Sequence, residues 1–215
     1  VIALCAGKPV GANIILGGFS GNDILSVKTV MIFAKRYFSA LFSEKQSELC
    51  EVNIKRASAE RGAIFVPCIN PDGAEIFSKG AAYAPGWLRK SIPFSGDKTA
   101  DYKANAAGVE IERNFDYDFE NRRKKEGLHS LAVKSPSLYS GKKAFSEPEA
   151  AGLRDLLKKC RPNLICSISS GAGEILWRSV SPHKNARRIA RVLCSLCGYA
   201  LEADIGPLSE GIFRS

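Results

Sequence analysis

Three short apolar runs constrain the fold of this chain most strongly. They occupy residues 13–18, 63–69 and 163–170. Each run is continuous rather than alternating and is stopped by glycine, serine or a turn sequence, which is typical of strands buried on both faces of a parallel sheet. Helical patterns accompany them, over residues 23–42, 147–160 and 182–197. This alternation predicts an α/β fold, a three-layer sandwich in which helices flank a mostly parallel mixed sheet.

Length and composition predict a single domain over residues 1–215, and truncation at both ends is left open. The hydrophobic fraction of 45% and the charged fraction of 25% are those of an ordinary globular protein. No apolar run approaches the ~20 residues that would span a bilayer. The apolar start, residues 1–6, has no basic leader and predicts a strand rather than a signal peptide.

Charge and cysteine content bear on partners and location. The formal net charge of +9 suits an anionic partner. Its basic clusters, residues 122–125 and 184–191, nevertheless lack the zinc-finger spacing or aromatic-basic signature of a nucleic-acid binder, so we expect no nucleic acid. Seven scattered cysteines favour a reducing compartment, and we expect a cytoplasmic protein. The CxxC pair at 194–197 falls in a helical pattern, which favours core packing.

Local signals mark where a site should lie. Ligands of such sheets bind at the carboxyl ends of strands, which points to residues 17–23, 69–73 and 169–174. Asn-Pro-Asp-Gly at 70–73 predicts a turn. Residues 80–108, rich in Gly, Ala, Pro and Ser, predict a long surface loop of the kind that is often functional. Ser146 is the expected N-cap of the helix that follows it.

Collinear motifs give the chain a resemblance to a known family. Residues 17–23 read Gly-Gly-Phe-Ser-Gly-Asn-Asp, and residues 67–73 read Pro-Cys-Ile-Asn-Pro-Asp-Gly. Residues 102–115 read Tyr-Lys-Ala-Asn-Ala-Ala-Gly-Val-Glu-Ile-Glu-Arg-Asn-Phe. Residues 145–150 read Phe-Ser-Glu-Pro-Glu-Ala, and residues 169–177 Ser-Ser-Gly-Ala-Gly-Glu-Ile-Leu-Trp. In this order the motifs resemble the zinc carboxypeptidases of family M14. They are most similar to the bacterial branch that cuts γ-D-glutamyl-diaminopimelate bonds in cell-wall peptides.

The resemblance also shows where the family's zinc ligands fall. The family holds zinc with two histidines and a glutamate, which lowers the pKa of a bound water. These positions fall on Ser20, Asp23 and Ser169. A serine hydroxyl is a poor zinc ligand near neutral pH. The two histidines of the chain, His129 and His183, lie outside the motifs, so we expect no bound cofactor, or zinc only if the family's activity persists.

The resemblance places substrate-binding functions on three residues. The family's Asn-Arg pair, which binds the terminal carboxylate of the substrate, falls on Glu112 and Arg113, and Lys103 takes the place of an arginine that polarises the carbonyl. Arg113 could still contact a carboxylate in bidentate fashion. Glu112 puts a negative charge beside it. A structural Glu112–Arg113 pair and a ligand site are both open at this point.

The catalytic side of the resemblance is incomplete. The segment Glu-Gly-Ile-Phe at 210–213 resembles the family's segment before the strand that carries the general base. That strand would lie beyond Ser215, so we expect the last strand and the base to be missing and no catalytic residue to be retained. Without metal and base there is no activated nucleophile.

Three functions follow from these observations. The leading one is a pseudopeptidase that binds carboxylate-bearing peptides, including cell-wall muropeptides. The second is an active zinc metallocarboxypeptidase with an unusual metal site. The third is a non-catalytic structural or interaction fragment, which an exposed sheet edge could join into a homo-oligomer.

Overall fold

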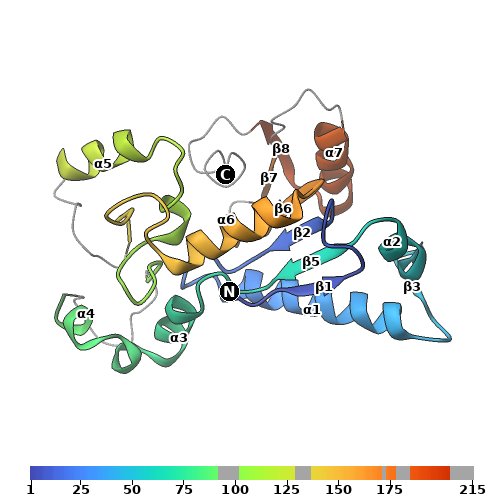
Figure 1. Ribbon diagram of the computed structural model, residues 1–215, viewed down its shortest axis with the longest axis horizontal. Coiled ribbons are helices and arrows are strands. Elements are labelled where there is room, and N and C mark those ends of the chain that lie inside the picture. The colour runs from blue at the N-terminus through green and yellow to red at the C-terminus, as the bar shows by residue number, and fades with distance from the viewer. Residues whose placement is uncertain (92–101, 129–136, 171–172, 178–184, 204–215) are drawn as a thin grey trace.

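A four-stranded mixed sheet forms the centre of the molecule, in a computed structural model (Figure 1). The structure describes residues 1–91, 102–128, 137–170, 173–177 and 185–203. The strand order is β1–β5–β2–β6, for strands β1 (Leu4–Ala6), β2 (Asn13–Leu16), β5 (Ala63–Val66) and β6 (Leu164–Ser167). Strand β2 runs parallel to both β5 and β6, and β1 is antiparallel to β5. The three predicted strands therefore pair as the sequence implied.

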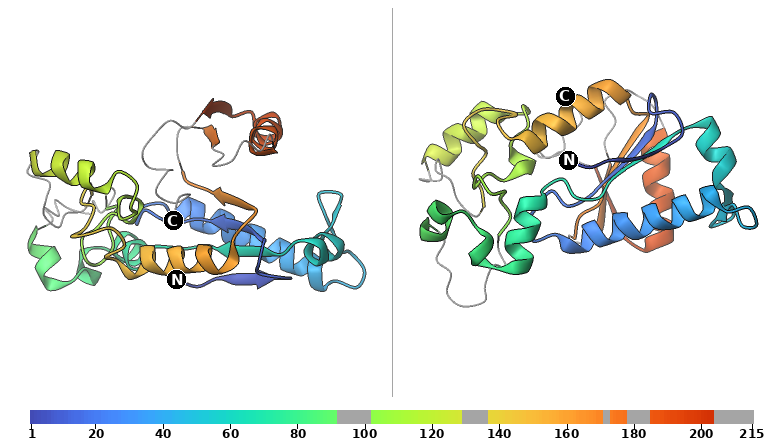
Figure 2. Two further views of the ribbon diagram at one scale, coloured as in Figure 1. Left: turned by 45° about the horizontal axis from the view of Figure 1, so that its top comes forward. Right: turned by 60° about the horizontal axis from the view of Figure 1, so that its bottom comes forward.

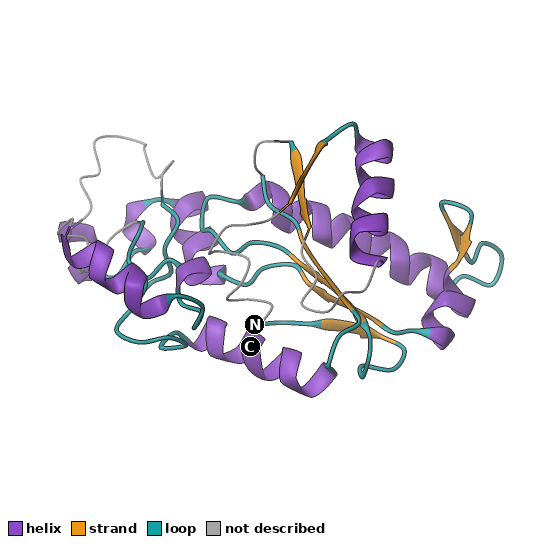
Figure 3. Ribbon diagram, turned by 90° about the horizontal axis from the view of Figure 1, so that it is seen from above, coloured by secondary structure: helices purple, strands orange, loops and turns teal. Residues whose placement is uncertain are grey.

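Alternation along the strands feeds two cores, one on each face of the sheet. Helix α6 (Pro148–Cys160) packs on the face that carries Ile14, Leu16, Ile64 and Val66. Helices α1 (Ile24–Phe42) and α2 (Ile54–Glu60) pack on the other face, around Phe65. Figure 3 shows the sheet between these helical layers. The arrangement is the predicted three-layer sandwich.

Strand β6 differs from the prediction. Its first three residues are half-buried and Ser167 is exposed, because among the described strands β6 pairs only with β2 and so forms an edge. The two-stranded hairpin of β3 (Glu48–Leu49) and β4 (Val52–Asn53) lies outside this sheet, between α1 and α2.

The segment expected to be a turn at residues 70–73 begins a helix instead. Helix α3 (Pro71–Lys79) has Asn70 as its N-cap, and the Asn70 side chain accepts a hydrogen bond from Gly73 N. Asparagine at the N-cap and proline at the first helical position are as typical of a helix start as of a turn. The prediction of a turn was therefore wrong.

The expected surface loop over residues 80–108 is partly helical. It contains the 3-10 turn η1 (Ala81–Tyr83) and helix α4 (Gly86–Ser91), while residues 92–101 lie outside the described part. Ala84, Leu88, Tyr102 and Ala104 pack with Ile76 of α3 in a small core of their own. Apolar burial thus orders the ends of the segment.

Two further elements connect this segment to α6. They are the 3-10 turn η2 (Ile111–Arg113) and helix α5 (Phe119–Leu128). At the start of α6 the N-cap is Glu147 rather than the predicted Ser146, and Pro148 is the first helical residue.

A small βαβ unit follows the sheet. Strands β7 (Glu174–Trp177) and β8 (Ala200–Ala203) pair in parallel, and helix α7 (Asn185–Cys197) connects them. Neither strand was predicted from the sequence. Figure 2 shows the unit beside the layered body rather than within it. The CxxC pair is not a core feature, because Cys197 is exposed and Cys194 half-buried.

Candidate functional site

The carboxyl ends of β2, β5 and β6 meet at one end of the sheet. Just beyond them, Asn70 N donates to Gly18 O at 2.8 Å, and Ile69 N to Gly17 O at 3.2 Å. On the other side of β2, Ile168 N donates to Leu16 O at 2.9 Å. The described parts of the three segments singled out from the sequence therefore lie side by side, as expected for parallel strands.

Asn70 joins this strand end to the segment that carries Lys103. Its fully buried amide donates from Nδ2 to Lys103 O at 3.2 Å and to Ala104 O at 3.1 Å. Gly21 N donates to the same Lys103 carbonyl at 3.0 Å. The backbone of Lys103 is thus fixed beside β2 and β5, while its side chain is exposed.

Two glycines allow this close packing. A Cβ atom on Gly73 would lie 2.4 Å from Ala104 O, and one on Gly21 would lie 2.8 Å from the Gly73 backbone. Contacts this short to backbone atoms leave no room for a side chain. The glycines of the Asn-Pro-Asp-Gly and Gly-Gly-Phe-Ser-Gly motifs are therefore required by the packing of the site.

Asp23 is buried, and its carboxylate holds backbone. It caps helix α1 by accepting from Ser26 N at 3.1 Å, and it accepts from Ser170 N at 3.2 and 3.3 Å. The side chain is only 7% exposed. Asp23 thus joins the start of α1 to the loop after β6.

The two serines at family ligand positions flank Asp23. The carbonyl of Ser20, a half-buried residue, accepts from Asp23 N at 3.1 Å. Ser169 is exposed and directly precedes Ser170, whose N–H is bonded to Asp23. The structure therefore brings all three positions to one end of the sheet.

Arg113 of η2 pairs with Glu110, not with Glu112 as considered from the sequence. Arg113 Nε donates to Glu110 Oε2 at 3.0 Å, and Leu138 N donates to the same oxygen at 2.7 Å. Arg113 is therefore held by Glu110, three residues earlier, rather than by its neighbour Glu112.

Glu112 lies within reach of the charges of Asp23 and Lys103. Burial of its carboxyl, followed by the negative charges of Glu110 and Asp23, raises the pKa of Glu112 to about 7. The positive charges of Lys103 and Arg113 oppose this rise without cancelling it. The Glu112 residue is half-buried. Near neutral pH this group exists in both protonation states.

The comparison with known families decides the identity of this arrangement. The zinc carboxypeptidase family, peptidase M14, matches residues 10–195. The chain belongs to the M14 family. A search of curated proteins gives no match.

Solved structures with the same fold include peptidases of this family. Murein-tripeptide amidase MpaA from Escherichia coli O157 has 19% identity and a TM-score of 0.50, with 92% of this chain and 64% of that chain covered. Carboxypeptidase A from Helicoverpa armigera has 18% identity and a TM-score of 0.53, with 91% and 48% covered. Bovine thrombin-activatable fibrinolysis inhibitor has 17% identity and a TM-score of 0.57, with 94% and 64% covered. This chain therefore spans between about half and two thirds of their lengths.

Zinc is the cofactor of the M14 family, and the donor set of this chain does not fit it. Two of the three positions carry serine hydroxyls, which bind zinc poorly. The third, Asp23, already accepts from two backbone N–H groups. Within the described ranges no group of three or more His, Cys, Asp or Glu side chains could hold a metal ion. His129, His183 and the segment 210–213 lie outside the described residues.

Asn105, to which the sequence assigned no role, connects the segment after Lys103 to the start of α6. Asn105 is buried, and its Nδ2 donates to Glu147 Oε2 at 2.8 Å and to Glu149 Oε1 at 3.3 Å. Burial raises the pKa of Glu149. The asparagines of Lys-Ala-Asn and Arg-Asn-Phe are the signal in the sequence from which this role could have been predicted. A buried asparagine amide can donate and accept several hydrogen bonds at once.

Replacing Asp23 with alanine is expected to lower the free energy of unfolding by about 2 kcal/mol. The variant removes a helix cap and leaves Ser170 N without its carboxylate. Denaturant titration measures the loss. Asp23→Asn keeps an N-cap acceptor and should lose less than half as much. An Asp23→Ala variant as stable as the original protein would contradict the structural role.

Proposed function

We propose that this M14 member is a pseudopeptidase that binds carboxylate-bearing peptides at the strand ends without cleaving them. One observation carries the proposal. The only carboxylate left at the family's ligand positions, that of Asp23, is buried and committed to backbone N–H groups of α1 and the loop after β6. No hydrolytic step is assigned, because the donor set does not fit zinc and no described residue supplies an activated water.

Lys103 and Arg113 support the binding part of the proposal. The Lys103 side chain is exposed at the strand ends. The hydrogen bond from Arg113 to Glu110 is donated by Nε of the guanidinium. A guanidinium has five N–H donors, so its terminal nitrogens suit a carboxylate. Glu112, once protonated, adds a neutral donor beside them. The similarity to a murein-tripeptide amidase favours a muropeptide as the peptide.

A calorimetric titration with a murein tripeptide tests this function. We expect saturable binding without release of amino acid, weakened about tenfold or more in Arg113→Ala because a charge-assisted contact is lost. Arg113→Lys keeps the charge and should retain part of the affinity, since only the forked geometry is removed.

The matched control is Arg61→Ala, which removes an exposed arginine at the end of α2 and should leave the affinity unchanged. Cleavage of the peptide would favour an active metallocarboxypeptidase instead. Absence of saturable binding in the original protein would favour the structural or interaction fragment.

A further inference from the structure

Helix α7 carries a large apolar surface that the rest of the described chain does not cover. Leu196 is 79% exposed, Val192 54% and Leu193 38%. Leu196 lies four residues after Val192 and three after Leu193, so the three side chains share one side of the helix. Ala190, by contrast, is buried, and α7 packs against β7 and β8. The exposed side is thus distinct from the side that holds the βαβ unit together.

The same helix is basic on its other exposed side. Arg187, Arg188 and Arg191 are exposed, and residues 185–197 contain no aspartate or glutamate. No helix of the described residues is long and apolar enough to cross a bilayer. A strongly two-sided helix of low net hydrophobicity with a basic polar face is instead the type that lies in the plane of a membrane surface.

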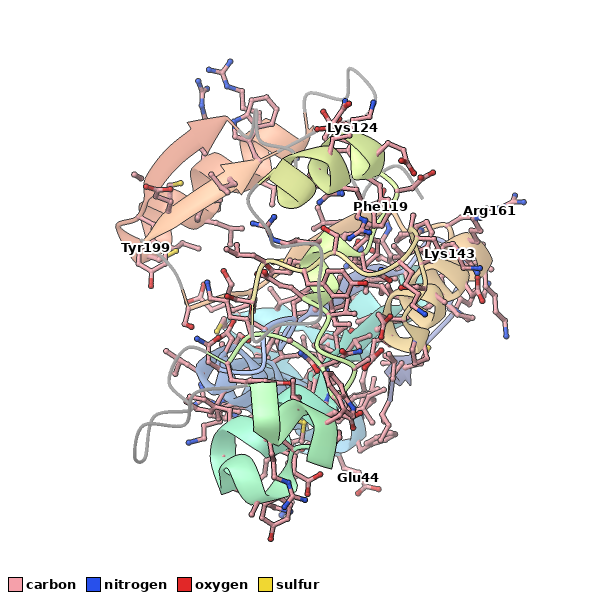
Figure 4. All side chains as sticks on the ribbon, turned by 90° about the vertical axis from the view of Figure 1, so that its left-hand side faces the viewer. Glu44, Phe119, Lys124, Lys143, Arg161 and Tyr199 are labelled. Atoms are coloured by element: carbon pink, nitrogen blue, oxygen red, sulfur yellow. The ribbon has the colours of Figure 1, made fainter. Side chains whose placement is uncertain are left out.

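The βαβ unit also carries aromatic side chains. The Arg187 guanidinium lies 5.8 Å from the centroid of the Trp177 ring. Tyr199 is 51% exposed at the surface of the unit (Figure 4). Tryptophan and tyrosine are enriched at the level of lipid headgroups, because their rings are apolar with one polar atom.

We propose that α7 docks the protein on an anionic lipid surface, with Val192, Leu193 and Leu196 entering the headgroup boundary and the arginines contacting lipid phosphates. Charge complementarity selects this occupant. A second α7 docked on this surface would offer the arginines no carboxylate, because residues 185–197 contain no aspartate or glutamate, and a nucleic acid would leave the apolar side chains in water. The surface belongs to the βαβ unit rather than to the strand ends, so the proposal is independent of peptide binding.

Co-sedimentation of the 215-residue chain with lipid vesicles tests the proposal. Vesicles of phosphatidylcholine with phosphatidylglycerol should bind the protein, and vesicles of phosphatidylcholine alone should bind it weakly. Leu196→Gln and Val192→Gln should each weaken binding about tenfold, since each withdraws an apolar side chain from the boundary. Arg188→Gln should weaken it about fivefold. Because these side chains are exposed, circular dichroism should be unchanged.

The matched control is Ile32→Gln, which replaces a 55% exposed isoleucine of α1 in the layered body and should leave binding unaltered. Three results would overturn the proposal. The first is no binding to anionic vesicles. The second is binding that the Leu196 and Val192 variants do not weaken, which would mean attraction by charge alone. The third is a dimer that Leu196→Gln dissociates, which would assign the surface to a second copy.

Discussion

Replacing Asn114 with alanine is expected to lower the free energy of unfolding by about 4 kcal/mol. The fully buried Nδ2 donates to Ser140 O at 2.7 Å, to Lys143 O at 3.1 Å and to Ser146 Oγ at 2.9 Å. Its Oδ1 accepts from Glu147 N at 3.0 Å, which fixes the start of α6. Alanine would leave several of these buried groups without a partner, and each such group costs about 1–3 kcal/mol. Chemical denaturation measures the change.

Asn121→Ala is the matched control. Asn121 is exposed and its amide donates to Asp118 on the surface of α5, so the same substitution should change the stability by less than about 0.5 kcal/mol. Similar losses at Asn114 and Asn121 would mean that the network around Asn114 does not hold α6 to the site segment.

Glu112→Gln is expected to stabilise the protein by about 2–3 kcal/mol at pH 8, and to have little effect at pH 4. The pKa of Glu112 is raised from 4.5 to about 7 in the folded state by burial and by the charges of Glu110 and Asp23. The folded protein therefore keeps a proton that the unfolded chain releases above pH 4.5. Stability from this group is complete below that pH and is lost as the pH rises through about 7.

Denaturant titrations of both proteins at several pH values measure this difference. Glu110→Gln serves as the contrast, because it removes the carboxylate that pairs with Arg113 and should destabilise by about 1–2 kcal/mol at pH 8. Equal pH profiles for the original protein and Glu112→Gln would show that the folded protein does not raise the pKa of Glu112.

The same titration bears on peptide binding. With Glu112 protonated, the charges of Lys103 and Arg113 balance those of Asp23 and Glu110; with Glu112 ionised, the site carries one net negative charge. A bound carboxylate should therefore be favoured below pH 7. Affinity for a murein tripeptide should fall as the pH rises through 7, and Glu112→Gln should abolish the fall.

Much of the fold follows from hydrophobic periodicity, because long segments with one strong pattern have few alternatives. The strands β2 and β5 and the helices α1, α6 and α7 all lie where their patterns predicted. Prediction failed where one short motif suits two structures, as at Asn70, which caps α3 instead of starting a turn. The four-residue strands β7 and β8 depend on pairing with each other, which local pattern does not report.

The sequence predicted where the site residues lie, at the strand ends, but not the hydrogen bonds that they make. Motif order placed Ser20, Asp23 and Ser169 together, and the strand ends do bring them together. The commitment of Asp23 to Ser170 N depends on how the loop after β6 returns to α1, a long-range contact. The choice of Glu110 over Glu112 as the partner of Arg113 depends on the tight η2 turn, which brings residues three apart onto one side.

Metal content shows whether Ser20, Asp23 and Ser169 can hold zinc. The protein should be incubated with excess zinc, passed over a desalting column and measured by elemental analysis, with Asp23→Ala alongside. Because two hydroxyls and a committed carboxylate do not form a zinc site, we expect zinc far below stoichiometry in both proteins and no change in thermal stability on addition of a chelator. Stoichiometric zinc in the original protein that is lost in Asp23→Ala would contradict the account and restore a metallopeptidase.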